Sequence, residues 1–544
     1  MINKDINAFE NKTKVLIDNL KSVCSNFGLG NDGNEYKIIT QIFLYKFIND
    51  KFIFEIKKIK NDLATSTNIE ENLQKLEKKK YDLLLLQLDE STARLDPENF
   101  ISNIFKKQEE ENFAEIFDKN LIDIAKKNND IFSILTSEGK KVLLFENVCQ
   151  YVRDKPNEFA VAIINQIVNF SFEKIIGSRY DFFASVFEYL IKDYNSNIGG
   201  AYAEYFTPHS VSKIMANCLI SKPKKNVTCY DPSSGSGTLL MNIANKVGVD
   251  KCTIFSQDIS QKSSQLLRLN LTLNNLVHSL PNIIEGNTLT NPAHIDKKNE
   301  LKKFDIIVSN PPFKLNFSEY RNQLLKDINL KRFFCGVPSV PPKKKDGMPI
   351  YLLFIQHIIF SLNQKGCAAI VIPTGFTTAI KGIEFKIKKY LVDHRLLKAV
   401  INMPSNIFAK TGTRVSILFI DKDQSNPSSA LLIDASNLGI TVKDGNNEKT
   451  YLTDKDEKNI TNCFLNNTEK KNFSKKVSYE EIKENSFSIN PKQYFDIEIK
   501  YEKLSHTEFS NVVKEKKIEL KKLFSNSKEI EEKLLKNLEK IKHE

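Results

Sequence analysis

The first part of the chain carries apolar residues at helical spacing. Pairs such as Ile42-Phe43 and Phe47-Ile48 recur at intervals typical of a buried helix face. Proline is rare in this region, and no glycine-rich nucleotide loop is present. The pattern predicts a helical N-terminal domain over residues 1–195.

The hydrophobic pattern changes after this region. From 196 to 425, short apolar runs alternate with helical segments, which is typical of an α/β domain with a doubly wound, mostly parallel sheet. Right-handed crossovers place the carboxyl ends of the parallel strands at one edge of such a sheet. The expected strands are Val227–Tyr230, Thr253–Gln257, Phe304–Ser309, Ala368–Ile372, Leu397–Ile401 and Val415–Ile420.

The last part of the chain is more polar. Residues 426–500 are rich in Asn and Lys and are expected to form a connector or small extension. Residues 501–544 are highly charged, but Ile530, Leu534 and Leu538 fall on one helical face. We expect an amphipathic C-terminal helix, which either packs on its own domain or docks on another subunit.

Composition narrows the function classes. The net charge of +12 favours a polyanionic partner, although abundant Lys, Asn and Ile without Trp also suit an AT-rich genome. The eight cysteines have no metal-type spacing, which indicates free thiols in a reducing cytoplasm and no structural zinc. No apolar run is long enough to cross a membrane and no signal-peptide pattern is present, so a cytoplasmic protein is expected.

A polar and aromatic tetrapeptide follows the central apolar strand. Asn310-Pro311-Pro312-Phe313 stands at the strand's carboxyl end, where open α/β sheets bind ligands. The Asn310 side chain and the Pro311 carbonyl offer acceptors, the prolines stiffen the turn, and Phe313 offers a stacking face. Such a group suits a planar ring that bears an amino group, although a tight turn with a buried Phe would have the same sequence.

A glycine-rich loop follows the first strand. It carries no Gly-Lys-Ser/Thr and no third glycine at the dinucleotide spacing, so neither a P-loop nor a dinucleotide site is predicted. An acid directly before the loop would repel a pyrophosphate but suits the ammonium and sulfonium of S-adenosylmethionine. The residues expected to bind this cofactor here are Asp231, Ser234, Gly235, Ser236 and Gly237.

Three further elements fit the same cofactor. Asp258 ends the second strand, where a carboxylate can accept both ribose hydroxyls, and Asn287 is expected to bind the adenine. An aspartate at a strand end is also a common helix cap. The third element lies upstream and consists of Glu204, Tyr205, Phe206, Thr207, Pro208 and His209.

The order of these motifs resembles one family. The chain resembles the modification subunit of Type I restriction-modification systems, a gamma-type adenine methyltransferase, from about residue 30 to about residue 425. The resemblance implies a Rossmann-like S-adenosylmethionine-dependent methyltransferase domain. It also implies catalysis by Asn310, Pro311, Pro312 and Phe313 on the 6-amino group of adenine, with Asn310 also at the cofactor. Two departures are Asp258, often Glu in the family, and Asn287, often Asp.

The resemblance also implies partners. They are double-stranded DNA, a specificity subunit flanked by two modification subunits, and a restriction subunit. A basic segment follows the tetrapeptide, and it is either a loop along the DNA or a disordered surface excursion. Its candidate DNA contacts are Lys314, Arg332, Lys343, Lys344 and Lys345.

Two other functions fit parts of the sequence. Enzymes that methylate RNA or a protein glutamine share the Asn-Pro-Pro motif, but they are usually shorter. A catalytically silent assembly scaffold is the other alternative, against which the intact cofactor motifs argue. No Pro-Cys pair supports a cysteine nucleophile, and the proposed transfer requires no metal.

Overall fold

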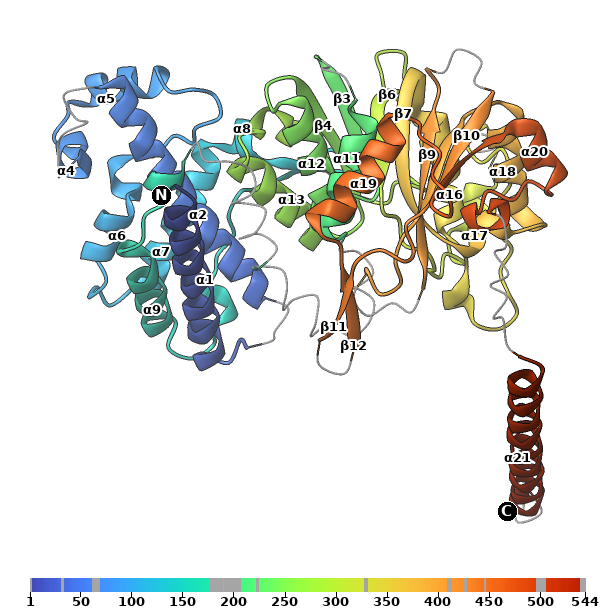
Figure 1. Cartoon of the computed structure of the whole chain (residues 1–544). Coiled ribbons are helices and arrows are strands. Elements are labelled where there is room, and N and C mark those ends of the chain that lie inside the picture. The colour runs from blue at the N-terminus through green and yellow to red at the C-terminus, as the bar shows by residue number, and fades with distance from the viewer. Residues whose placement is uncertain are drawn as a thin grey trace. The chain divides into compact units, whose positions relative to one another are not determined.

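A large mixed sheet forms the core of the unit Met1–Phe495 (Figure 1). The computed structural model describes residues 2–30, 34–60, 69–176, 189, 207–221, 225–326, 331–408, 413–423, 428–444, 447–495 and 505–538. The chain divides into two compact units, Met1–Phe495 and Asp496–Glu544. Among the described residues, no helix combines the length and apolar character of a membrane span.

The sheet has eleven strands in the order β13-β10-β8-β9-β7-β6-β3-β4-β5-β1-β2. Strands β2, β9 and β13 run opposite to the others, so the expected mostly parallel sheet is confirmed. The strands are β1 (Ile134–Thr136), β2 (Lys141–Val142), β3 (Val227–Asp231), β4 (Cys252–Asp258), β5 (Ile283–Glu285), β6 (Phe304–Ser309), β7 (Leu362–Pro373), β8 (Leu397–Asn402), β9 (Val415–Asp421), β10 (Ser429–Asp434) and β13 (Ser474–Ser478).

All six expected strands are present, but the sheet extends beyond the expected domain. Strands β1 and β2 come from the region expected to be mostly helical. Strands β10 and β13 come from the stretch expected to be a connector or small extension, as does a separate hairpin of β11 (Ile440–Asp444) and β12 (Asn447–Tyr451). Both regions that flank residues 196–425 therefore add strands to the same sheet.

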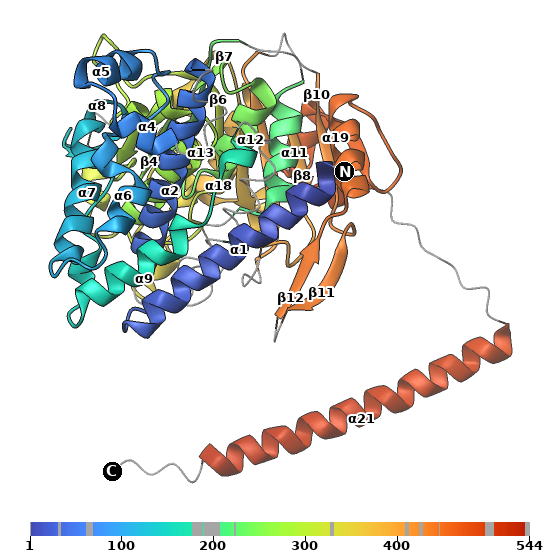
Figure 2. The same cartoon turned by 90° about the vertical axis from the view of Figure 1, so that its left-hand side faces the viewer.

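Helices cover both faces of the sheet (Figures 1 and 2). Ile306 and Val308 of β6 face one apolar core, whereas Ile307 between them faces the other. The first core includes helices α11 (His209–Leu219), α12 (Thr238–Val247), α13 (Gln261–Leu273) and α19 (Asp454–Leu465). The second includes α16 (Tyr351–Ser361), α18 (Gly382–Asp393) and α20 (Tyr479–Glu484), and the short helices α14 (Arg321–Leu324) and α17 (Gly375–Thr378) lie in loops of the same domain.

The N-terminal helices share the first core with the sheet. Arg268 of α13, which is buried, donates hydrogen bonds to the carbonyls of Val142, Leu143 and Leu144 at 3.1, 2.7 and 3.3 Å. The helical region is thereby joined to the sheet by polar contacts as well as by apolar packing. Its helices are α1 (Ile2–Asn26), α2 (Glu35–Ile59), α4 (Ile69–Gln74), α5 (Lys78–Leu86), α6 (Ile101–Lys106), α7 (Phe113–Lys127), α8 (Asn129–Phe132) and α9 (Pro156–Val168).

The second unit contains one long helix, α21 (His506–Leu538). Its apolar side chains are exposed, among them Leu523, Phe524, Ile530 and Leu534. The expected C-terminal helix is therefore confirmed.

Candidate active site at the carboxyl edge of the sheet

The loop after β3 is held by glycine geometry and by the neighbouring strand. Gly237 has a φ of +83°, which favours glycine, and a Cβ there would lie 2.2 Å from Leu267 Cδ1. The Gly235 N–H donates to Asp258 Oδ2 at 2.8 Å, so the loop is tied to the end of β4. The buried Ser234 hydroxyl has no hydrogen-bond partner among the described residues, which makes it a candidate ligand contact.

Two acids approach each other beneath this loop. Asp231 is 1% exposed and accepts a hydrogen bond from the Ser233 N–H at 2.9 Å. Burial, reinforced by the charge of Asp258, raises the pKa of Asp231 to about 8. Burial also raises the pKa of Asp258. A cationic ligand would relieve this repulsion, so the arrangement fits the ammonium and sulfonium of S-adenosylmethionine.

The turn after β5 closes the next part of the site. Asn287 Oδ1 accepts a hydrogen bond from the Leu289 N–H at 2.9 Å, and the Thr288 hydroxyl donates to the Pro232 carbonyl at 2.7 Å. Burial raises the pKa of Tyr320, and the neighbouring Asn287 side chain offsets part of this rise. Asn287, the residue expected to bind adenine, therefore uses its side-chain carbonyl oxygen to shape the turn, and Thr288 fixes the turn against the first loop.

The tetrapeptide lies at the end of β6 as expected. Asn310 is 6% exposed, and its Nδ2 donates to the Thr207 hydroxyl at 3.1 Å. This contact brings the upstream segment to the tetrapeptide across 103 positions of sequence. Phe313 packs edge-to-face on Tyr351 with ring centroids 6.2 Å apart. The site thus combines a buried amide with an aromatic ring braced from α16.

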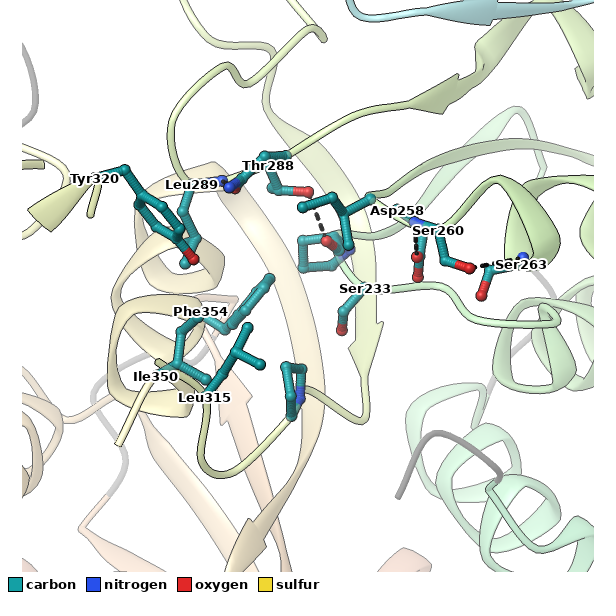
Figure 3. Close-up of a pocket in the computed structure, with 14 residues that line it drawn as sticks. Ser233, Asp258, Ser260, Ser263, Thr288, Leu289, Leu315, Tyr320, Ile350 and Phe354 are labelled. Atoms are coloured by element: carbon teal, nitrogen blue, oxygen red, sulfur yellow. Dashed lines mark hydrogen bonds between the residues drawn. The ribbon is translucent and has the colours of Figure 1, made fainter. Parts of the chain in front are cut away.

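A pocket opens between these loops (Figure 3). It encloses about 880 Å³ of empty space including its mouth, which is large enough for a cofactor. Its polar groups suit hydroxyls, and its apolar side chains suit an aromatic ring. The lining residues are Pro232, Ser233, Asp258, Ile259, Ser260, Ser263, Asn287, Thr288, Leu289, Pro312, Leu315, Tyr320, Ile350 and Phe354.

The predicted cofactor residues occupy different places around this pocket. Asp258 and Asn287 line it, whereas Asp231 and Gly235 do not line it but form hydrogen bonds to lining residues. Of the upstream segment, Pro208 precedes the first turn of α11, which begins at His209. The predicted residues Glu204, Tyr205 and Phe206 lie outside the described residues.

One expected DNA contact in the basic segment after the tetrapeptide is buried. Arg332 is 2% exposed and donates to the Thr288 carbonyl at 3.1 Å and to the Leu289 carbonyl. Such burial is incompatible with the expected contact to DNA phosphates. Lys314 and the run Lys343, Lys344 and Lys345 are exposed.

Several lining residues were missed in the sequence. Leu315 and Tyr320 carry no motif, because they lie in an irregular segment, and only their proximity to Asn310 in sequence was available as a signal. Phe354 lies on a helix that resembles one of the family, but the uniformly apolar sequence of this helix did not mark it as a lining residue. Their position becomes evident once the segment folds back over the strand ends.

The fold and the site together are those of the Rossmann-like methyltransferase class. The family model described as N-6 DNA Methylase matches residues 178–503, and the chain belongs to this family. The family resemblance of the motifs is thereby confirmed.

Curated relatives are Type I methylase subunits. The Type I restriction enzyme MpnII methylase subunit of Mycoplasma pneumoniae is 32% identical over 341 residues, which are 61% of this chain and 60% of that protein. The HindI methylase subunit of Haemophilus influenzae is 23% identical over 431 residues, 76% of this chain and 92% of that protein. The chain thus spans less than two thirds of the MpnII subunit and 65% of the MjaIX methylase subunit of Methanocaldococcus jannaschii.

A solved structure shares the fold. The methyltransferase subunit of a type I restriction-modification system from Streptococcus thermophilus superimposes with a TM-score of 0.71 at 21% identity. The match covers 90% of this chain and 100% of that one. It supports the architecture of both the helical region and the sheet.

Proposed function

We propose that the protein transfers a methyl group from S-adenosylmethionine to the 6-amino group of adenine in double-stranded DNA. It would act as the modification subunit of a Type I restriction-modification complex and protect host DNA in the cytoplasm. The observation that carries the proposal is the buried Asn310, held by Thr207 at the end of β6 beside the pocket. Membership of the N-6 DNA methylase family supports it.

The residues of the site suit this chemistry. S-adenosylmethionine would supply a methyl group activated by its sulfonium, with Asp258, Asn287 and the loop after β3 as its binding residues. The target adenine must leave the duplex stack to reach the site. Asn310 Oδ1 and the Pro311 carbonyl would then accept the two amino hydrogens and align the nitrogen lone pair. Phe313, braced by Tyr351, would stack on the base.

The names of the relatives support the proposed partners. The relatives are named methylase subunits of Type I restriction enzymes, so we assign this chain to a complex with a specificity subunit and a restriction subunit. Two copies would flank one specificity subunit. The exposed apolar face of α21 is the proposed docking element, and the exposed Lys314, Lys343, Lys344 and Lys345 are the proposed phosphate contacts.

The test is methyl transfer from labelled S-adenosylmethionine to host genomic DNA, with and without the specificity subunit. We expect label in 6-methyladenine only when both subunits are present. Asn310→Ala should lower the rate by about a thousandfold, because the amino nitrogen loses an aligned acceptor, while cofactor binding is retained. Asn462→Ala, at an exposed amide on α19, should leave the rate unchanged.

Two results would overturn the assignment. Label on RNA or protein, with none on DNA, would move the substrate to another class. Absence of S-adenosylmethionine binding by the wild-type chain would indicate a catalytically silent scaffold.

A further inference from the structure

We propose that the described parts of segment 314–350 form the outer wall of the cofactor pocket. In this wall Tyr320 contacts the adenine base of the cofactor, and Arg332 is a positioning residue for the turn Asn287–Thr290. The inference rests on the proposed function, because it takes S-adenosylmethionine as the ligand. The segment, expected to be either a loop along the DNA or a surface excursion, thereby also takes part in the cofactor site.

The wall is attached to three successive carbonyls of the turn. Arg332 donates to the carbonyls of Thr288 and Leu289, and Gln323 Nε2 donates to the carbonyl of Thr290 at 3.2 Å. Since the Thr288 hydroxyl also binds the Pro232 carbonyl, the turn is held from both sides. Displacement of the wall would therefore displace the turn that carries Asn287.

Arg332 is chemically suited to this position. Its guanidinium lies 4.4 Å from the centre of the Phe333 ring, and burial lowers its pKa to about 10. A planar fork of donors can reach two neighbouring carbonyls at once, whereas the single ammonium of lysine lacks this geometry. A buried cation would be unfavourable here without such acceptors.

The wall has its own apolar core. Phe317, Leu324 and Phe333 from the segment pack with Leu289 of the turn and Leu353 of α16. The hydrogen bonds to the turn are thus accompanied by a packed apolar cluster to which the segment, the turn and α16 all contribute. This packing explains how an irregular segment can hold a pocket wall in one position.

Tyr320 is the aromatic side chain that this wall presents to the pocket. Figure 3 shows its ring on the side of the pocket opposite Asp258, with Thr288 between them. The Asn287 side chain lies close enough to the Tyr320 phenol to offset part of the rise that burial causes in its pKa. With Asp258 at the ribose, the ring occupies the side on which a stacked adenine would lie.

The first test measures binding by titration calorimetry with S-adenosylmethionine and with methylthioadenosine, which lacks the amino-acid portion. Tyr320→Ala should weaken both ligands by the same factor, about tenfold, because a stacking contact to the base is lost. Tyr320→Phe should lose no more than about threefold, since it keeps the ring. A loss confined to S-adenosylmethionine, or no loss with either ligand, would overturn the assignment of Tyr320.

The second test uses steady-state kinetics. Arg332→Lys should raise KM for S-adenosylmethionine by about tenfold and leave kcat at saturating cofactor within about twofold. Arg153→Lys, at an exposed arginine outside the wall, is the matched control and should change neither constant. A merely structural role would lower kcat and the melting temperature with KM unchanged, and that result would overturn the positioning role.

Two measures keep the outcomes distinct. If Arg332→Lys fails to fold, Gln323→Ala tests the same attachment through the Thr290 carbonyl and should raise KM by a smaller factor. If the wild-type chain does not bind S-adenosylmethionine, the proposed function fails and this inference fails with it. If the wild type binds and the variants bind equally well, only this inference fails.

Discussion

The catalytic edge of the sheet and helix α21 obtain their structure in different ways. At the edge, Asp258 and Thr288 bond to loops distant in sequence, so the chain supplies its own long-range partners. Along α21, ion pairs such as Lys516–Glu519 and Lys533–Glu529 are local, and the apolar side chains remain exposed. The first region is thus completed within the chain, whereas the second has an apolar face suited to an external partner.

The largest expected effect comes from breaking the junction between α13 and residues 142–144 of the N-terminal region. Arg268→Met removes the donor for the carbonyls of three consecutive residues, and we expect the free energy of unfolding to fall by about 3 kcal/mol. Urea denaturation followed by circular dichroism measures the change. Arg153→Met, at an exposed arginine, is the control, and an equal effect of both variants would show that the junction contributes nothing.

A smaller loss is expected from the loop after β3. Gly237→Ala places a Cβ on a left-handed residue and against Leu267, which should lower the free energy of unfolding by about 2 kcal/mol. Thermal melting monitors the effect. Gly347→Ala serves as the control, because no neighbouring atom lies within 4 Å of the added Cβ. Equal stability of the two variants would contradict the described loop geometry.

The pH dependence of cofactor binding tests the pair of acids. Because the pKa of Asp231 is raised to about 8, a cation that requires its ionised form must displace a proton below that pH. Affinity for S-adenosylmethionine should therefore rise with pH, by up to about tenfold per unit, and level off near pH 8. Titration calorimetry measures this dependence. Asp231→Asn should flatten the profile, and a flat wild-type profile would refute the linkage.

The smallest effect on stability is expected in α21. Leu523→Gln combined with Leu534→Gln should change the free energy of unfolding by less than about 0.5 kcal/mol, because both leucines are exposed. The same variant should lose co-purification with the specificity subunit, whereas Ser525→Gln should retain it. A lowered melting temperature would instead show that the helix packs on its own chain.

Much of the fold was predictable from local patterns. The apolar runs that became β3, β4 and β6 end within about one residue of their predicted bounds, since a buried strand followed by a polar turn has a clear local signature. The same reasoning placed Asp258 and Asn310 at one edge, and both lie there. Asn287 was expected from the order of the motifs alone, because β5, the strand before it, was not predicted. A strand's direction is less visible: the run at β9 is apolar whichever way it points.

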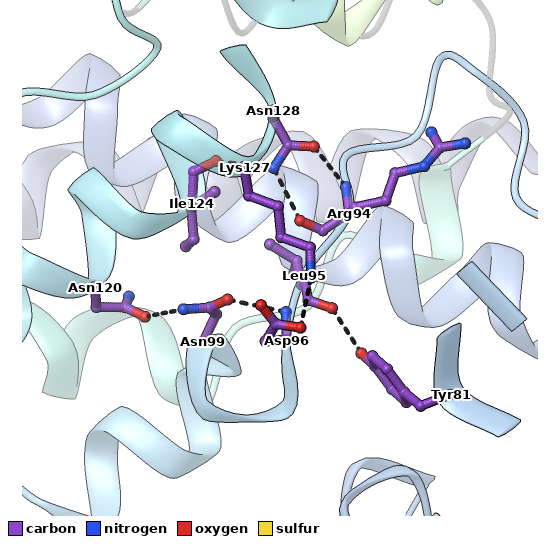
Figure 4. A network of polar contacts seen from close by, with 9 residues as sticks. All are labelled: Tyr81, Arg94, Leu95, Asp96, Asn99, Asn120, Ile124, Lys127 and Asn128. Carbon is purple, nitrogen blue, oxygen red and sulfur yellow. Dashed lines mark hydrogen bonds and ion pairs between the residues drawn. The ribbon is translucent and has the colours of Figure 1, made fainter. Parts of the chain in front are cut away.

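Contacts between distant residues were not predictable. The burial of Arg332 depends on how a segment without periodicity folds back, and basic residues are usually exposed. In the helical region, Tyr81 donates to the Leu95 carbonyl, and Asn128 bonds to the backbone of Arg94 (Figure 4). Hydrophobic spacing carries no information about these polar pairings.

The position of β9 in the sequence determines when β7 can be paired on both sides during synthesis. β7 is complete at Pro373, but its second neighbour in the sheet is not made until Val415–Asp421 leaves the ribosome. Until then, one side of an apolar strand has unpaired N–H and C=O groups, the arrangement from which strands of different chains associate. A fragment that stops before residue 415 keeps that edge open, so shortened versions of this protein should extend beyond Asp421 to avoid aggregation.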